Sequence, residues 1–202
     1  MPRFLLPFTL FTAGFGLMIP AAAGLFTANY SAFRQYISEL GAMGMPQAAL
    51  VNYGIFLPTG ILNLVSVGWL IAALPRQYKT PAFLLFGLAL GNFGAVVFPC
   101  DMGCPAMGSD RQAVHNLLGL LQYGTGGLAL MWMSRRAAYP LGVGLGLLVL
   151  GCLVQMGGPG IEMRGLWQRV AELCLYGWLP FCAWRFTGIT AGRRGVSLSL
   201  EP

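Results

Sequence analysis

Six long apolar stretches, each about as long as a membrane's hydrocarbon core is thick, restrict the fold of this chain more than any other feature. They cover about residues 4–27, 50–74, 81–99, 113–133, 139–157 and 167–186. About 20 helical residues cross a hydrocarbon layer of roughly 30 Å. A helix satisfies its own backbone hydrogen bonds, and these stretches lack the alternation of a transmembrane β-barrel. The sequence therefore predicts an all-α, polytopic integral membrane bundle of six transmembrane helices.

Composition and charge placement support a membrane protein. The chain is 56% hydrophobic and 9% charged, against about 25% charged in average soluble domains. Its net charge of +6 does not indicate a nucleic-acid partner, because the basic residues flank the spans. Eight lie at the termini and in the second and fourth connections, namely Arg3, Arg76, Lys79, Arg135, Arg136, Arg185, Arg193 and Arg194. The positive-inside rule then predicts cytoplasmic termini and external first, third and fifth connections.

The chain is expected to form one transmembrane domain over residues 1–190, followed by a cytoplasmic tail at 191–202. Glycine pairs within the spans, at 87–91 and 142–146, predict close helix packing. In the first external connection, Tyr30, Phe33, Tyr36, Ile37 and Leu40 recur at helical spacing. This pattern predicts a short amphipathic helix on the outer surface, placed as a lid over the bundle.

Two cysteines in the third connection, Cys100 and Cys104, flank the sequence "DMG". On the predicted topology they face an oxidising compartment, which favours a disulfide between them. The alternative is a copper(I) or thiol-redox site, since Met102, Met107 and His115 are also soft or intermediate ligands. The spacing matches no known metal signature, so no metal ligands are assigned. The remaining cysteines, Cys152, Cys174 and Cys182, are expected to be free thiols within the bundle.

Polar residues recur along one side of the fourth and sixth spans. His115, Gly119 and Gln122 share one helical face beside Asn116 and Tyr123, and Gln168 and Arg169 precede Glu172 and Tyr176. Polar groups at membrane depth normally face partners or a wet cavity. The stripe therefore predicts a pocket or a polar clamp, with candidate ligand-binding residues Arg34, Glu39, Asn116, Gln122, Arg169 and Glu172. Arg34 is the preferred partner of Glu172, and Arg169 is the alternative.

A catalytic arrangement is the alternative use of the same polar groups. Ser38 provides a hydroxyl, His115 a base and Asp101 a carboxylate, which are the residue types of a nucleophilic hydrolase. Their spacing along the chain does not establish that they meet. They would come together only if the lid folds over the mouth of the bundle.

Four motifs carry a resemblance to a known family. "RQYISELGA" at 34–42, "FPCDMGCP" at 98–105, "VHNLLG" at 114–119 and "QYG" at 122–124 resemble the prokaryotic membrane family catalogued as domain of unknown function 998. The resemblance implies a multi-helix membrane protein, with shared polar residues matching Arg34, Ser38, Glu39, Cys100, Asp101, Cys104, His115 and Asn116. It implies no established activity or cofactor. A weaker similarity is to alkaline-ceramidase-type membrane hydrolases, from which this chain differs in having six spans and no later histidine pair.

These observations favour an inner-membrane protein of a prokaryote with an extracytoplasmic polar pocket. The expected role is to bind a lipid head group, or to act as an accessory subunit of a membrane complex. The expected partners are membrane lipids and other membrane subunits. A lipid-directed hydrolase using Ser38, Asp101 and His115, and copper or thiol-redox handling through Cys100 and Cys104, remain the alternatives.

Overall fold

The computed structural model describes residues 4–158 and 162–187, and within these ranges the chain is helical without strands. The elements are α1 (Leu5–Leu25), the 3₁₀ helix η1 (Ile37–Gly41), α2 (Ala48–Val51), the π-helical turn η2 (Asn52–Phe56), α3 (Leu57–Ala73), α4 (Arg76–Phe83), α5 (Phe86–Val97), α6 (Asp110–Arg136), α7 (Pro140–Gly157) and α8 (Arg164–Arg185). The predicted tail at 191–202 lies outside the described residues.

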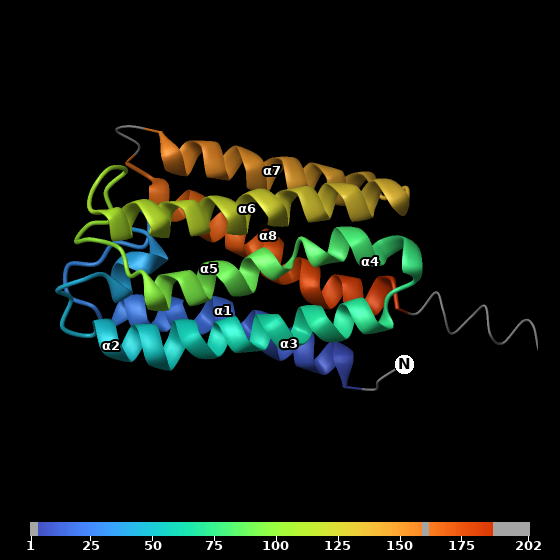
Figure 1. Ribbon diagram of the computed structural model, residues 1–202, viewed down its shortest axis with the longest axis horizontal. Coiled ribbons are helices and arrows are strands. Elements are labelled where there is room, and N and C mark those ends of the chain that lie inside the picture. The colour runs from blue at the N-terminus through green and yellow to red at the C-terminus, as the bar shows by residue number, and fades with distance from the viewer. Residues whose placement is uncertain (1–3, 159–161, 188–202) are drawn as a thin grey trace, which may run out of the picture.

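The long helices run side by side along the length of the molecule (Figure 1). Residues 26–47 and 98–109 lie together at one end, with the starts of α6 and α8. We call this the loop end. The start of α1 and the turn from α6 to α7 lie at the opposite end (Figure 1). The first and third connections therefore share one end of the bundle with the starts of α6 and α8.

Four segments are long and apolar enough to cross a membrane: Leu5–Leu25, Ala48–Ala73, Arg76–Val97 and Pro140–Gly157. Each corresponds to a predicted apolar stretch. The remaining two stretches form α6, with 27 residues, and α8, with 22 residues. At about 1.5 Å per residue both are long enough to span. Their polar side chains make them less apolar than the other four, and these are the helices that carry most of the candidate site.

Glycines set the close contacts between neighbouring helices, as the sequence predicts. On α5, Gly91 packs against the Gln122 side chain of α6. On α7, a Cβ at Gly146 would lie 2.5 Å from Met131 Cγ and 2.6 Å from the carbonyl oxygen of Gly127. These distances leave no room for a methyl group. The small residues therefore allow α6 to lie against both α5 and α7.

The lid, residues 30–41, is not the amphipathic α-helix that the sequence predicted. Turns precede η1, and helical structure is restricted to Ile37–Gly41. The reason is that α8 binds the lid carbonyl groups. Arg169 Nη1 donates to Ala32 O at 2.7 Å, Leu166 N donates to Phe33 O at 3.0 Å, and Arg164 Nε donates to Arg34 O at 3.2 Å. These tertiary partners replace the i to i+4 bonds of a helix.

Candidate functional site

Two adjoining hollows lie at the loop end. The larger is a groove of about 990 Å³ between the lid, α6, α7 and the start of α8. The smaller is an inner cavity of about 70 Å³ between the lid, α5, α6 and α8. They share five lining residues: Ser38, His115, Gly119, Tyr123 and Gln168. The inner cavity and the groove therefore share part of their walls.

The groove has a polar part and an apolar part. Charged side chains line it at the lid and at the start of α8, namely Arg34, Glu162 and Arg164. Its other walls include Leu120 of α6 and Leu153 and Val154 of α7. This combination suits a molecule with a polar head and an apolar chain.

Glu172 is the acidic group of the inner cavity. It is 7% exposed, and its Oε1 accepts hydrogen bonds from Gln122 Nε2 at 2.9 Å and Tyr123 OH at 2.6 Å. The chain of bonds continues, because Gln168 Nε2 donates to Tyr123 OH at 3.0 Å and Ile37 N donates to Gln168 Oε1 at 2.6 Å. Glu172 Oε2 is buried without a hydrogen-bond partner among the described residues. Glu172 thus lines the cavity and has one buried carboxylate oxygen without a partner among the described residues.

The predicted pairing of Glu172 with Arg34 or Arg169 is wrong. Arg34 is exposed, and Arg169 donates to the carbonyl groups of Ala32 and Gln35 and to Tyr30 OH. Helical spacing does not separate the candidates, because Gln168 and Arg169 both lie about one turn from Glu172 on α8. The lid instead takes up the Arg169 guanidinium, whereas Gln168 and Glu172 both bond to Tyr123 OH.

Arg164 is the arginine that forms a buried ion pair at the loop end. Its Nη2 lies 3.1 Å from Oε1 of Glu39, whose side chain is 5% exposed. Glu39 also accepts from Gln35 Nε2 at 3.1 Å and Tyr36 N at 2.9 Å. Arg164 further donates to Gly103 O at 2.9 Å, and its guanidinium lies 4.8 Å from the Tyr36 ring centre. This side chain therefore connects the lid, the third connection and α8.

Asp101 stabilises the start of α6 and lines neither hollow. It accepts from Ser109 N at 2.8 Å, from Ser109 Oγ at 2.9 Å and from Arg111 Nη2 at 2.8 Å. These bonds, the backbone N–H of Ser109 first and Arg111 next, lower the pKa of Asp101 below its ordinary value. His115 Nδ1 instead lies 2.9 Å from Phe98 O. Ser38 and His115 share the inner cavity, but Asp101 does not join them.

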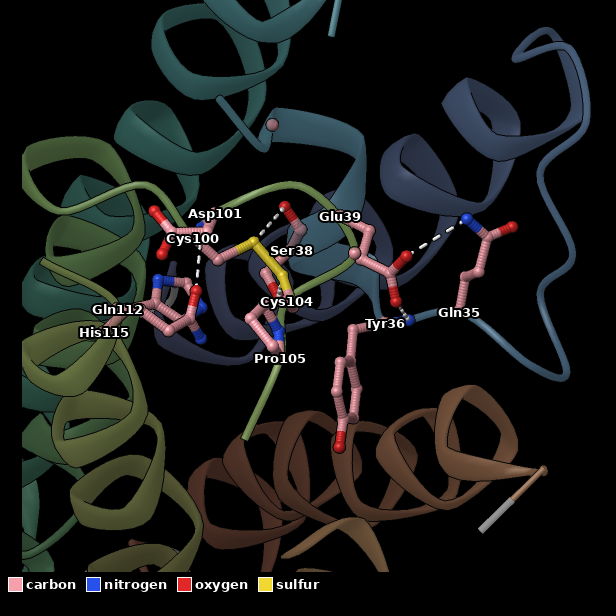
Figure 2. The surroundings of a disulfide bond; sticks show 12 residues. Gln35, Tyr36, Ser38, Glu39, Cys100, Asp101, Cys104, Pro105, Gln112 and His115 are labelled. Carbon is pink, nitrogen blue, oxygen red and sulfur yellow. Dashed lines mark hydrogen bonds between the residues drawn. A yellow bond between two sulfur atoms is a disulfide. The ribbon is translucent and has the colours of Figure 1, made fainter. Parts of the chain in front are cut away.

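A disulfide connects Cys100 and Cys104, whose Cα atoms are 5.2 Å apart, as the sequence predicted. Figure 2 shows it between the lid and the start of α6. Cys104 Sγ lies 3.4 Å from Ser38 Oγ. The ligand atoms of Cys100, Cys104 and His115 all lie within 4.8 Å of one another. The predicted free thiols Cys152, Cys174 and Cys182 are also confirmed.

The six predicted ligand-binding residues divide into three groups. Arg34 and Asn116 line the groove, and Gln122 and Glu172 line the inner cavity. Glu39 and Arg169 line neither and instead hold the lid.

Sequence reasoning missed Asn92 and Arg164 as site residues. Asn92 lines the inner cavity from α5, and its signal was a single amide in an apolar stretch. Arg164 follows the fifth apolar stretch as an isolated basic residue, and the sequence carries no signal for its contacts with the lid and the third connection.

The comparisons with known proteins identify a family. The model of the family described as "Protein of unknown function (DUF998)" matches residues 11–185. No curated protein and no solved structure matches the chain. The matched segment contains every residue that lines the groove or the inner cavity.

Proposed function

This chain belongs to the DUF998 family, and we propose that it is a six-helix membrane protein that binds the head group of a lipid or similar amphiphile at its loop end. The observation that carries the proposal is the groove. Its volume of about 990 Å³ lies at the upper end of the roughly 300–1,000 Å³ of small-molecule sites. Charged groups at one part and leucine and valine side chains at another match an amphiphile.

The proposal includes α6 and α8 as membrane spans. They lie alongside the four apolar spans (Figure 1). Polar residues toward the loop end of these helices, such as Gln122 and Glu172, line the inner cavity, and Arg169 binds the lid. Basic residues at the end opposite the loop end, Arg76, Lys79, Arg135, Arg136 and Arg185, support a cytoplasmic location for that end. The disulfide at the loop end fits an oxidising, external compartment.

A topology experiment tests this orientation. A reporter that is active only outside the cytoplasm is fused after Arg185 in one variant and inserted at Gly44, in the first connection, in another. We expect activity from the Gly44 insertion alone, because Gly44 lies at the loop end. Activity from the Arg185 fusion would reverse the topology and contradict an external groove.

Filling the groove tests the binding proposal. Gly119 lines both hollows, and a Cβ there would have no atom within 4 Å. Gly119→Trp should therefore be tolerated by the fold while its ring fills the site. Gly151 on α7 has the same free space around its Cβ and does not line either hollow, so Gly151→Trp is the matched control.

Binding is measured by native mass spectrometry of purified protein mixed with phosphatidylethanolamine and phosphatidylglycerol. We expect bound lipid on the wild type and on Gly151→Trp, and little on Gly119→Trp. Equal lipid binding by all three proteins would contradict the proposal. If no lipid binds but Gly119→Trp releases a co-purified membrane protein, the accessory-subunit alternative is supported instead.

A second candidate function is soft-metal or thiol-redox handling, which the cluster of Cys100, Cys104 and His115 favours. The disulfide must first be reduced, because thiolates are the metal ligands. Reduced protein should then bind one copper(I) ion, and Cys100→Ser should abolish this binding. Cys174→Ser, which changes a free thiol elsewhere in the bundle, is the control. Absence of binding after complete reduction would exclude the metal site.

A further inference from the structure

Residues that line the inner cavity carry hydrogen-bond acceptors that the described residues leave unused. A carboxylate has about four acceptor sites, and Glu172 uses Oε1 for two donors while Oε2 has none. His115 adds a second acceptor. Because its Nδ1 contacts a carbonyl oxygen, Nδ1 must carry the hydrogen, which leaves Nε2 of the neutral ring as an acceptor. Ser38 also lines this cavity, and its Oγ lies 3.4 Å from Cys104 Sγ.

The two arginines of α8 near the lid do not supply a positive charge to Glu172. Arg169 is committed to lid carbonyl groups and Tyr30, and Arg164 is committed to Glu39 and Gly103. In the described ranges, neither arginine forms an ion pair with Glu172. A buried carboxylate without a cation is unfavourable unless it takes up a proton or a charged partner enters the site.

We propose that the inner cavity is a subsite for a primary ammonium group, so that the preferred amphiphile carries an amine in its head group. An ammonium offers three donors and one positive charge, which match the unused acceptors of Glu172, His115 and Ser38. The cavity, at about 70 Å³, has room for such a group but not for a whole head group. This inference rests on the proposed function, because the remainder of the ligand occupies the groove.

The charges of the two hollows support the same arrangement. Arg34 is exposed and lines the groove, whereas Glu172 lines only the inner cavity. A zwitterionic head group that places its phosphate in the groove and its ammonium in the cavity meets a charge of opposite sign at each position. An anionic head group without an amine leaves Glu172 unpartnered.

The experiment compares three lipids on the wild-type protein by native mass spectrometry: phosphatidylethanolamine, its N-acetyl derivative and phosphatidylglycerol. The N-acetyl derivative keeps the phosphate and chains but lacks the positive charge. We expect phosphatidylethanolamine to bind at least about tenfold more tightly than the other two, as one charge-assisted contact provides. Equal affinity for all three would overturn the ammonium subsite while leaving the proposed function intact. Binding of none would instead refute the proposed function.

Two variants that each remove one acidic side chain test whether Glu172 determines the lipid preference. Glu172→Gln should remove the preference for phosphatidylethanolamine and keep the affinity for phosphatidylglycerol within about twofold. Asp110→Asn, which removes an exposed acid at the start of α6 that lines neither hollow, should keep the preference. If both variants keep it, or if only Asp110→Asn loses it, the subsite is not at Glu172. The wild-type comparison decides the matter even if Glu172→Gln fails to fold.

Methylamine distinguishes a lipid head group from a free amine as the source of the ammonium. Competition by millimolar methylamine against phosphatidylethanolamine would show that the ammonium group alone occupies the cavity. Failure to compete, together with the lipid preference, would show that the ammonium is bound only as part of a head group. Both results support the subsite.

Discussion

Replacing Arg164 by alanine should destabilise the loop end more than any other single removal of a charge there. Removing one partner of a buried ion pair costs about 3–5 kcal/mol. Two features reduce this figure: the Arg164 side chain is 30% exposed, and Glu39 keeps its bonds from Gln35 and Tyr36. We therefore expect Arg164→Ala to lower the free energy of unfolding by about 2–3 kcal/mol.

The control is Arg111→Ala, which removes a second ion pair that the described residues form at the loop end. Arg111 and Asp101 are 36% and 24% exposed, and such pairs contribute about 0–1 kcal/mol. Unfolding in mixed detergent, followed by circular dichroism over a denaturant series, gives both values. Equal effects of the two variants would refute the argument from burial.

A double-mutant cycle isolates the ion pair from the other contacts of Arg164. In a Glu39→Gln background no buried charge is left behind, so Arg164→Ala should cost only about 1 kcal/mol for the lost bonds to carbonyl groups. Lack of coupling between the two changes would show that the ion pair is not what holds the lid.

Three further predictions concern packing, the disulfide and pH. Gly146→Ala should destabilise by about 1–3 kcal/mol, because its Cβ meets Met131 and backbone, whereas Gly144→Ala, with free space, should be neutral or stabilising in the same unfolding assay. Reducing the Cys100–Cys104 disulfide, with a separation of 4 residues, should lower the free energy of unfolding by about 2 kcal/mol, and no change would argue against the bond. Because the pKa of Asp101 is lowered, its stabilising effect is complete above about pH 4 and is lost as the pH falls through the lowered pKa. Wild type should therefore exceed Asp101→Asn in melting temperature at neutral pH but not at strongly acidic pH, and a constant difference would contradict this assignment.

The sequence was sufficient to predict features that depend on neighbouring residues. Apolar length marked the positions of the long helices, and small-residue spacing marked α5 and α7 as closely packed helices. The spacing of Cys100 and Cys104, together with the predicted oxidising compartment, favoured their disulfide. Each of these features depends on residues that are near in the chain or on one helical face, so pattern alone carries the information.

The predictions that failed concern features that depend on which group, distant in the chain, is available as a hydrogen-bond partner. The apolar pattern at Tyr30, Phe33 and Tyr36 is helical, yet the carbonyl groups of the lid bind α8 instead of their own turn. Glu172 was assigned an arginine from a count of charges, whereas its position on α8 directs it to Gln122 and Tyr123. A count of charges does not specify which way a side chain faces. A hydrogen bond between residues distant in the chain leaves no pattern in the local sequence.

The attachment of the lid to α8 also determines when the site can form during synthesis. The donors to Arg34 O and Ala32 O lie 130 and 137 positions later in the chain. Until synthesis has reached Arg169, the lid segment therefore lacks donors that bind its carbonyl groups in the folded protein. Gly165 adds a steric condition, since a Cβ there would lie 2.7 Å from Ala32 O. The first connection therefore has to wait for α8 before it can take its final conformation, and the walls of the groove and the inner cavity are completed only at that step.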